Sequence, residues 1–553
     1  MKRKYLVFSI VVLISSLIYS GCSLDEELYG IPNPASITKS KDVEVMVNGL
    51  YSTMNPYPFK LGIYALITTD DQKLFANNLT AENVSIANRT YDATDARSNL
   101  IWVNFFNMVG AANNLLDVSQ TLEGKIDPVV LQDARGHAHF IRAFAYYYLV
   151  RLFGKVPIRT ESYTLEQEKF LARSSVDSVY DLIFSDFKRA GELLPLKTAT
   201  SIRGKAGKEA AFGMLASASL TYANYLDYNK TGDKNTYFKQ AKDYADSVIR
   251  FNTYSLVPDF AKLWDVANEA SNYQSEVLFG IQYTRDPFDN TRLSKGSMFA
   301  SQYSPVQTEN SLTTVGWYPV QPYVMDEYNY ESGSFEGDYR IKVSFFTNWT
   351  RRNGVTFVSY PTPRLTGQND GVYPYIKKYK DVGAEQFNGE NDMYILRMAE
   401  IYLIYAEAEN ELNGPTADAY EKFNKLRERA RNADGQASAF PKDLAPVSNK
   451  YEFRMAVFNE RGLEFIGEDI KRFFDLIRMI SNTGEAMFMY RIKNVINKIP
   501  EGKPIWNNAQ QKYLGGRKTG DVFKAVTEKH LLLPVPKSQI DANPNLAPQN
   551  PGW

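Results

Sequence analysis

The chain has 553 residues, and its 63 Lys and Arg residues balance its 63 Asp and Glu residues. With zero formal net charge, nothing in the composition attracts the protein to nucleic acid or to an acidic membrane surface, so we expect no nucleic-acid partner. The length exceeds that of most single domains, and a single cysteine excludes an intramolecular disulfide, so stability must come from packing.

The N-terminus has the pattern of a bacterial lipoprotein signal. Residues 2–4 are basic and residues 5–19 carry no charge, a length typical of a signal peptide and short for a membrane span. The segment YSGC then places small residues before Cys22, which resembles a lipobox, although Tyr19 stands where that pattern usually has Leu. We predict a lipoprotein signal peptide over residues 1–21 and lipidation of Cys22; an ordinary secretory signal is the alternative.

Residues 104–250 show helical periodicity, and the expected helices form pairs. Apolar residues recur at spacings of three and four, Pro128 suits the first turn of one helix, and Gly154 suits its end. Ser174 or Ser175 suits the N-cap of the next pair. The helices are expected over residues 104–122, 128–154, 175–195, 207–226 and 237–251.

The same pattern returns late in the chain, over residues 392–414, 416–433 and 449–479. Alternating small and aromatic positions at a spacing of roughly 34 residues resemble tetratricopeptide repeats. We therefore predict a mainly α fold, in which about four helix pairs form a right-handed helical solenoid.

Between residues 254 and 392 the helical periodicity disappears. Gly, Pro, Asn and Asp increase, and β-prone pieces occur over residues 276–284, 342–349 and 372–379. A long irregular insertion on a helical scaffold is a typical place for a binding site. The expected regions are a signal peptide (1–21), a tether with ligand-site residues (22–100) and a first set of repeat helices (101–253). The irregular insertion (254–392), further repeat helices (393–485) and an irregular C-terminal segment (486–553) follow.

Four segments resemble one known family in the same order. They are HFIRAFAYYYLVRLFGKVPI, LRMAEIYLIYAEAENELNG, FNERGLEFIGEDIKRFFDLIR and the C-terminal HLLLPVPKSQIDANPNLAPQNPGW, and they are similar to the SusD/RagB family of outer-membrane lipoproteins from the Bacteroidetes. The resemblance implies a surface-exposed, non-enzymatic glycan-binding lipoprotein that acts as a hinged lid on a SusC-like TonB-dependent transporter and delivers oligosaccharides to it. The acidic SLDEE after the cysteine resembles the signal for the outer face of the outer membrane.

A glycan site needs an exposed aromatic ring beside polar groups, because sugars present C–H faces flanked by hydroxyls. Two segments offer this combination, the loop TTVGWYPVQPY in the insertion and a polar stretch before the first repeat helix. The resemblance implies that the glycan site draws on both. The predicted carbohydrate-binding residues are Trp317, Tyr318, Tyr91, Asp70, Asp71, Asn88 and Arg89, whereas Trp102, Trp349 and Trp506 are interpreted as core.

Other chemistry is weakly indicated. Glu460, Glu464 and Glu468 lie four residues apart, but Arg residues alternate with them, so we predict ion-paired packing rather than acid–base catalysis. No cofactor or metal is expected; residues 227–233 imitate the first half of a calcium loop, yet Phe238 stands where that loop needs Glu, so a polar turn is favoured. The remaining alternatives are binding of a peptide or another nutrient, and an extracytoplasmic glycoside hydrolase.

Overall fold

The computed structural model describes residues 37–55, 69–71, 80–162, 170–198, 201–285, 296–306, 308, 316–328, 337–371, 373–384, 388–433, 435–519 and 526–553. The predicted signal peptide and Cys22 lie outside these residues. Within them, no helix combines the length and the apolar character that a bilayer span requires.

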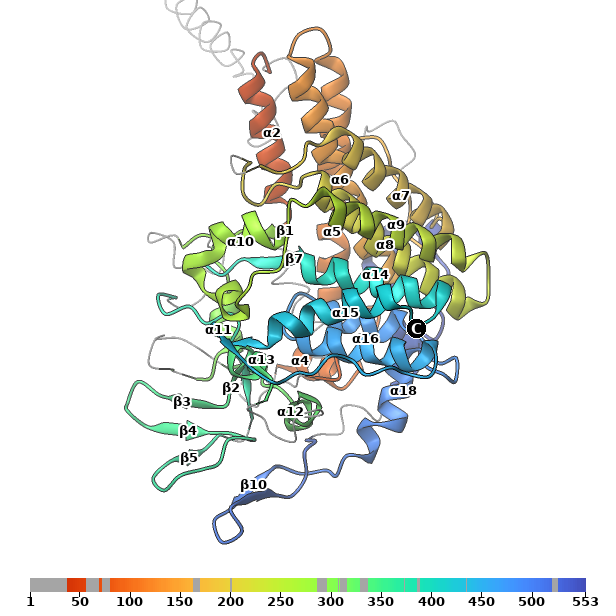
Figure 1. Ribbon diagram of the computed structural model, residues 1–553. Helices are drawn as coiled ribbons and strands as arrows, with labels where there is room; N and C mark the ends of the chain where they lie inside the picture. Colours follow the sequence, from red (N-terminus) through yellow and green to blue (C-terminus); the bar gives the residue numbers. More distant parts are fainter. Residues whose placement is uncertain are drawn as a thin grey trace, which may run out of the picture.

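The first half of the protein is a stack of long helices in which each packs on the next (Figure 1). The predicted boundary residues are confirmed: Pro128 opens α6, Gly154 ends it, and the Ser175 hydroxyl accepts a hydrogen bond from the backbone of Ser178 at the start of α7. The helices are α5 (Ala96–Thr121), α6 (Pro128–Phe153), α7 (Val176–Leu193), α8 (Lys208–Asn229) and α9 (Lys234–Phe251). The mainly helical prediction is confirmed.

The irregular insertion interrupts this stack rather than following it. Helix α14 (Met398–Asn413) packs closely against α9 although the insertion separates them in sequence. It also contacts α15 (Ala417–Ala430) and α16 (Lys450–Glu464), and α17 (Lys471–Arg478) follows. The insertion is therefore held at both ends by helices that are neighbours in space.

The prediction of one helix over residues 392–414 is wrong in its first part. Residues Met393–Arg397 form strand β7, which pairs antiparallel with β1 (Val277–Ile281). All five residues of each strand are buried, and a short apolar run of this kind gives no periodicity by which to separate strand from helix.

The insertion itself contains short helices and small sheets. Strands occur in each of the three β-prone pieces, as predicted, and β3, β4 and β5 project away from the helical stack in Figure 1. Its elements are α10 (Glu269–Ser275), α11 (Phe299–Tyr303), α12 (Pro322–Tyr328), α13 (Tyr339–Ser344), β2 (Phe345–Phe346), β3 (Asn348–Thr350), β4 (Thr356–Val358), β5 (Asn369–Asp370) and β6 (Tyr375–Ile376).

Shorter elements complete the described part of the chain. Helix α2 packs on α5 and α6, and β10 pairs with β11 in a hairpin of the C-terminal segment. These elements are α2 (Ser40–Ser52), α4 (Ala81–Ala87), α18 (Met487–Asn494), α19 (Lys537–Ala542), β8 (Asn432–Ala433), β9 (Gln436–Ala437), β10 (Ile505–Asn507) and β11 (Lys512–Leu514).

Candidate functional site

The two aromatic residues predicted as a binding platform have different environments. The ring of Tyr318 has no exposed surface, whereas Trp317 is half-buried, and the ring centroids lie 6.3 Å apart at 78°. The backbone N–H of Trp317 donates to the carbonyl of Gln302 in α11 across 2.9 Å. Trp317 is thus fixed against the insertion with part of its ring accessible, while contact of a ligand with Tyr318 would require this loop to rearrange.

Asp70 and Asp71 are buried, and they attach their chain segment to α17, α18 and the insertion. Asp70 accepts hydrogen bonds from Arg472 at 2.6 and 2.8 Å and also from Arg491. Burial alone would raise the pKa of Asp70, but these two guanidinium groups hold it well below its usual value. For Asp71, burial and the neighbouring charge of Asp70 raise the pKa to about 6. The carbonyl of Asp71 accepts from the backbone of Gln321 at 2.9 Å, so this segment and the insertion meet.

The remaining predicted residues differ in exposure. Arg89 is buried in a left-handed backbone conformation, with its guanidinium 5.3 Å from the ring of Phe488. Tyr91 is buried against Trp553 at the end of the chain, with 5.0 Å between the ring centroids. Asn88, the residue after α4, is exposed. Of the seven predicted residues, Trp317 and Asn88 therefore present accessible surface.

A cavity of about 350 Å³, which we call the insertion pocket, lies in the irregular insertion. Aromatic rings, hydroxyl groups, an amide and three lysines line it together. The lining comprises Phe345, Phe346, Trp349, Ser304, Thr308, Thr347, Thr350, Asn348, Lys342, Lys377, Lys380, Asp381 and Ala300. Its volume and its mixture of rings with a few polar groups are typical of small-ligand sites.

Short strands place the rings of this pocket. Strand β2 pairs with β6 so that Phe346 lies opposite Tyr375, and β3 pairs with β4 so that Trp349 lies opposite Phe357. The rings of Trp349 and Phe357 stack at 9° with centroids 5.9 Å apart. Trp349 is buried and forms part of a small aromatic cluster, which confirms its interpretation as core, and this cluster supports the pocket wall.

Trp317 lies close to this pocket. Gly316 takes a positive φ of 58°, and a Cβ there would lie 3.1 Å from the ring of Tyr375 and 3.4 Å from the carbonyl of Ser304. Because Ser304 lines the pocket, the backbone at Gly316, one residue before Trp317, lies beside the pocket wall. The sequence analysis does not predict this pocket, because Lys342 and Lys377 come together only through the pairing of β2 with β6. The lysines in and beside residues 372–379 are the one signal in the sequence that could have indicated a charged site here.

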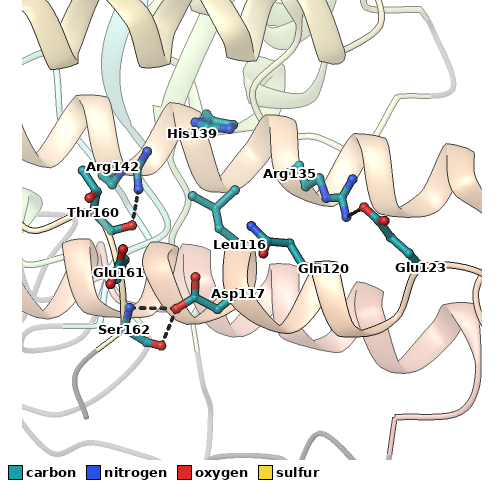
Figure 2. A pocket seen from close by; sticks show the side chains of 10 residues that line it. All are labelled: Leu116, Asp117, Gln120, Glu123, Arg135, His139, Arg142, Thr160, Glu161 and Ser162. Carbon is teal, nitrogen blue, oxygen red and sulfur yellow. Dashed lines mark hydrogen bonds and ion pairs between the residues drawn. The ribbon is translucent and has the colours of Figure 1, made fainter. Parts of the chain in front are cut away.

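A larger open groove of about 830 Å³ lies along α5 and α6 (Figure 2). Its polar groups bind one another: Arg135 pairs with Glu123 at 2.6 Å, Arg142 donates to the carbonyl of Thr160 at 3.0 Å, and the Asp117 carboxylate accepts from Ser162. Among the described residues that line it, none is Trp, Tyr or Phe. With no ring among these residues for a sugar to stack on, this groove is a weaker candidate than the insertion pocket.

Glu460, Glu464 and Glu468 form buried ion pairs, as predicted, but their partners come from other elements rather than from the arginines that alternate with them. Glu460 accepts from Arg340 at 2.7 Å, and Glu468 accepts from Lys378 at 2.7 Å. Glu464 accepts from Arg340 at 3.1 Å and from Arg397 at 2.8 Å. The side chains of all three glutamates have no exposed surface. Because Arg340 and Lys378 belong to the insertion, the network attaches the insertion to α16.

Residues 227–233 comprise the last turn of α8 and the short polar turn that leads to α9. Asp227 pairs with Lys234 at 2.7 Å, and Asp233 caps α9 by accepting from the backbone of Asn235. These contacts confirm the interpretation as a polar turn between helices.

Comparisons with known proteins cover nearly the whole chain. A sequence model described as the SusD family matches residues 222–553, and one described as "Starch-binding associating with outer membrane" matches residues 24–220. The chain is 28% identical over 567 aligned positions to the SusD-like protein P2 of Formosa agariphila, covering 100% of both chains.

Solved structures share the fold. A SusD homologue from Bacteroides thetaiotaomicron superposes with a TM-score of 0.75 at 20% identity, covering 94% of this chain and 98% of the other. A protein described as a laminarin-binding SusD-like protein superposes with a TM-score of 0.67 at 20% identity, over 93% of this chain and 99% of the other. The tetratricopeptide-like helical fold predicted from the sequence is that of these proteins.

Proposed function

This chain belongs to the SusD family, and from that membership we propose that it is a non-enzymatic glycan-binding lipoprotein of the outer membrane. It is anchored through lipid on Cys22, faces the exterior, captures oligosaccharides, and delivers them to a partner SusC-like TonB-dependent transporter. The description of the second matching model, which names starch binding and the outer membrane, supports this role. So does the binding of laminarin named for one protein of the same fold.

The observation that carries the proposal is the insertion pocket. Its rings are largely buried, and the parts of Phe346 and Trp349 that line the cavity can contact the C–H faces of a sugar. Asn348 and the surrounding threonines offer hydrogen bonds to hydroxyl groups. Trp317 on the adjoining chain segment adds a half-exposed ring. We assign binding to this surface.

Binding rather than hydrolysis is supported by the state of the carboxylates. A glycoside hydrolase needs two carboxyl groups about 5 to 10 Å apart across an open cleft. Glu460, Glu464 and Glu468 are instead enclosed in ion pairs, and Asp381 in the pocket wall is bound to Arg285 at 2.9 Å.

A glycan array probed with the purified protein tests the proposal. We expect binding to a restricted set of oligosaccharides, with no release of shorter products when the bound glycans are incubated with the protein. The variant Asn348→Ala should weaken binding, since Asn348 is exposed and lines the pocket. Binding to no glycan, or turnover of a bound one, would contradict the proposal.

A further inference from the structure

The insertion pocket has an unusual distribution of charge. Lys342, Lys377 and Lys380 line it, and within the described part of the chain none of the three has a carboxylate partner within 4.0 Å. Among the described residues of the lining, Asp381 is the one acidic residue, and it accepts from Arg285 at 2.9 and 3.1 Å and from the backbone of Gly383 at 2.9 Å. The lysines therefore give the pocket an excess of positive charge in a chain whose overall charge is balanced.

The backbone holds these lysines together. The N–H of Lys377 donates to the carbonyl of Ser344 at 2.7 Å, which continues the pairing of β2 with β6. The ammonium of Lys377 donates to the carbonyl of Lys342 at 2.9 Å, and the N–H of Lys380 donates to the carbonyl of Lys377 at 2.9 Å. The end of α13 and the end of β6 thus present their cations to the same cavity.

Clustering like charges without a counter-ion is unfavourable. Burial and then repulsion from Lys380 lower the pKa of Lys377. A bound anion would remove that repulsion, and ammonium groups form strong, charge-assisted hydrogen bonds to carboxylate or sulfate oxygens. Lysine acts as a flexible point charge, so three lysines suit anionic groups whose position varies from one sugar unit to the next.

We propose that the insertion pocket selects acidic glycans, which carry uronate or sulfate groups, and that Lys342, Lys377 and Lys380 bind those groups. This inference rests on the proposed function of glycan binding. Phe346, Asn348 and the threonines contact the sugar, and the lysines discriminate between an acidic glycan and its uncharged counterpart. A concave pocket of about 350 Å³ fits sugar units better than the flat surface of a membrane.

Matched ligands test the inference directly. The purified protein is titrated calorimetrically with oligogalacturonates and with their neutral methyl esters, and with sulfated galactan oligosaccharides and their desulfated counterparts. We expect the acidic member of at least one pair to bind at least tenfold more tightly at low salt. The preference should shrink severalfold at 0.5 M salt, because mobile ions screen accessible charges.

The triple variant Lys342→Gln, Lys377→Gln and Lys380→Gln removes the charges and keeps much of the side-chain length. It should lose at least tenfold in affinity for the acidic ligand and change less than twofold for a neutral one. The control triple variant Lys41→Gln, Lys155→Gln and Lys503→Gln makes the same change in net charge at exposed positions outside the pocket, and should bind like the unmodified protein.

The outcomes separate the two proposals. If acidic and neutral glycans bind equally and the pocket variant behaves like the control, selection of acidic glycans is overturned while glycan binding stands. If neither an array of acidic and neutral glycans nor these titrations show any binding, glycan binding itself is overturned. Binding to vesicles of anionic lipid that the pocket variant loses, without any preference among glycans, would also overturn the inference.

Discussion

Arg397 donates a hydrogen bond to Glu464 across 2.8 Å, and the side chains of both have no exposed surface. Arg397 is the last residue of β7, where the insertion rejoins the helices, and Glu464 is the last residue of α16. Glu464 also accepts from Arg340 of the insertion and from Arg429 of α15. This carboxylate therefore connects the insertion, which holds the candidate site, to the helical stack.

The variant Glu464→Gln should be strongly destabilised. It removes one of the carboxylates that neutralise Arg340, Arg397 and Arg429, while Glu276 still pairs with Arg397 and Arg429. The buried cluster then carries one uncompensated positive charge, and breaking a buried pair in this way costs about 3–5 kcal/mol. Urea unfolding measures the loss in the free energy of unfolding. The control Asp246→Asn removes the half-buried partner of the exposed Arg250 and should cost less than about 1 kcal/mol. Equal losses of stability in the two variants would contradict the stabilising role of Glu464.

Buried glutamates in ion pairs predict loss of stability in acid. For Glu400, the charges of Lys471 and Arg461 overcome the effect of burial and lower the pKa to about 2. For Glu464, burial is overcome by Arg429 and its neighbours, and the pKa is held well below its ordinary value. The pKa of a glutamate in the unfolded chain is about 4.3. These groups therefore stabilise the fold fully above about pH 5 and progressively less toward about pH 2.

Urea midpoints measured between pH 7 and pH 3 check this expectation. The midpoint should decrease steeply below about pH 5, and Glu400→Gln should reduce the steepness. A midpoint that stays constant down to pH 3 would show that the pKa values of these carboxylates do not differ between the folded and unfolded states as expected.

Glu269 should give the opposite dependence on pH. Burial and the nearby charge of Asp392 raise its pKa to about 8, while its carboxyl accepts from the Asp392 backbone at 2.8 Å. The folded state then keeps a proton that the unfolded chain releases above about pH 4.3, so this contribution to stability is lost as the pH rises toward about 8.

Glu269→Gln removes this titration. Between pH 5 and pH 8, its free energy of unfolding relative to the unmodified protein should rise by more than about 1 kcal/mol, since one pKa unit corresponds to about 1.4 kcal/mol. The exposed control Glu428→Gln should keep a constant difference. A constant difference for Glu269→Gln as well would mean that Glu269 is ionised in the folded protein at pH 5.

The helices could be predicted from the sequence because their signals are local. Pro128, Gly154 and Ser175 act on the adjacent turn of backbone, and the spacing of Ala241, Ala245 and Val248 marks the buried face of α9. The run over residues 393–396 is apolar without a strand period, and the partner that makes it a strand, β1, is distant in sequence, so local signals predict a helix there.

The candidate site depends on pairings over longer distances. Strand β6 brings Lys377 beside Lys342, and α11 provides Ser304 to the same wall. Exposure is equally non-local: Trp317 and Tyr318 are adjacent, yet only one ring is accessible. For these reasons the sequence predicts that the candidate site lies in the insertion but does not predict which side chains form its surface.

Gly371 tests how the pocket wall is supported. A Cβ at this position would lie 2.4 Å from Cη2 of Trp349, too close for the ring to remain in place. Gly371→Ala should therefore displace Trp349, cost about 1–3 kcal/mol as overpacking does, and change the tryptophan fluorescence. The control Gly110→Ala in α5 meets no atom within 4 Å and should be neutral or stabilising by up to about 1 kcal/mol; similar behaviour of the two variants would contradict the close contact.

Trp317 and Tyr318 can be separated by experiment, because one ring is accessible and the other is buried. Trp317→Ala should weaken glycan binding about fivefold or more, corresponding to about 1 kcal/mol from a lost aromatic contact, with little change in stability. Tyr318→Ala should cost about 3–5 kcal/mol in the free energy of unfolding, as loss of a large buried ring does. Within the described residues the buried Tyr318 hydroxyl has no hydrogen-bond partner, so Tyr318→Phe should leave stability unchanged or raise it. Calorimetric titration of a bound glycan and urea unfolding of each variant provide the two measurements, and a loss of binding in Tyr318→Phe without loss of stability would show that the hydroxyl contacts the ligand after all.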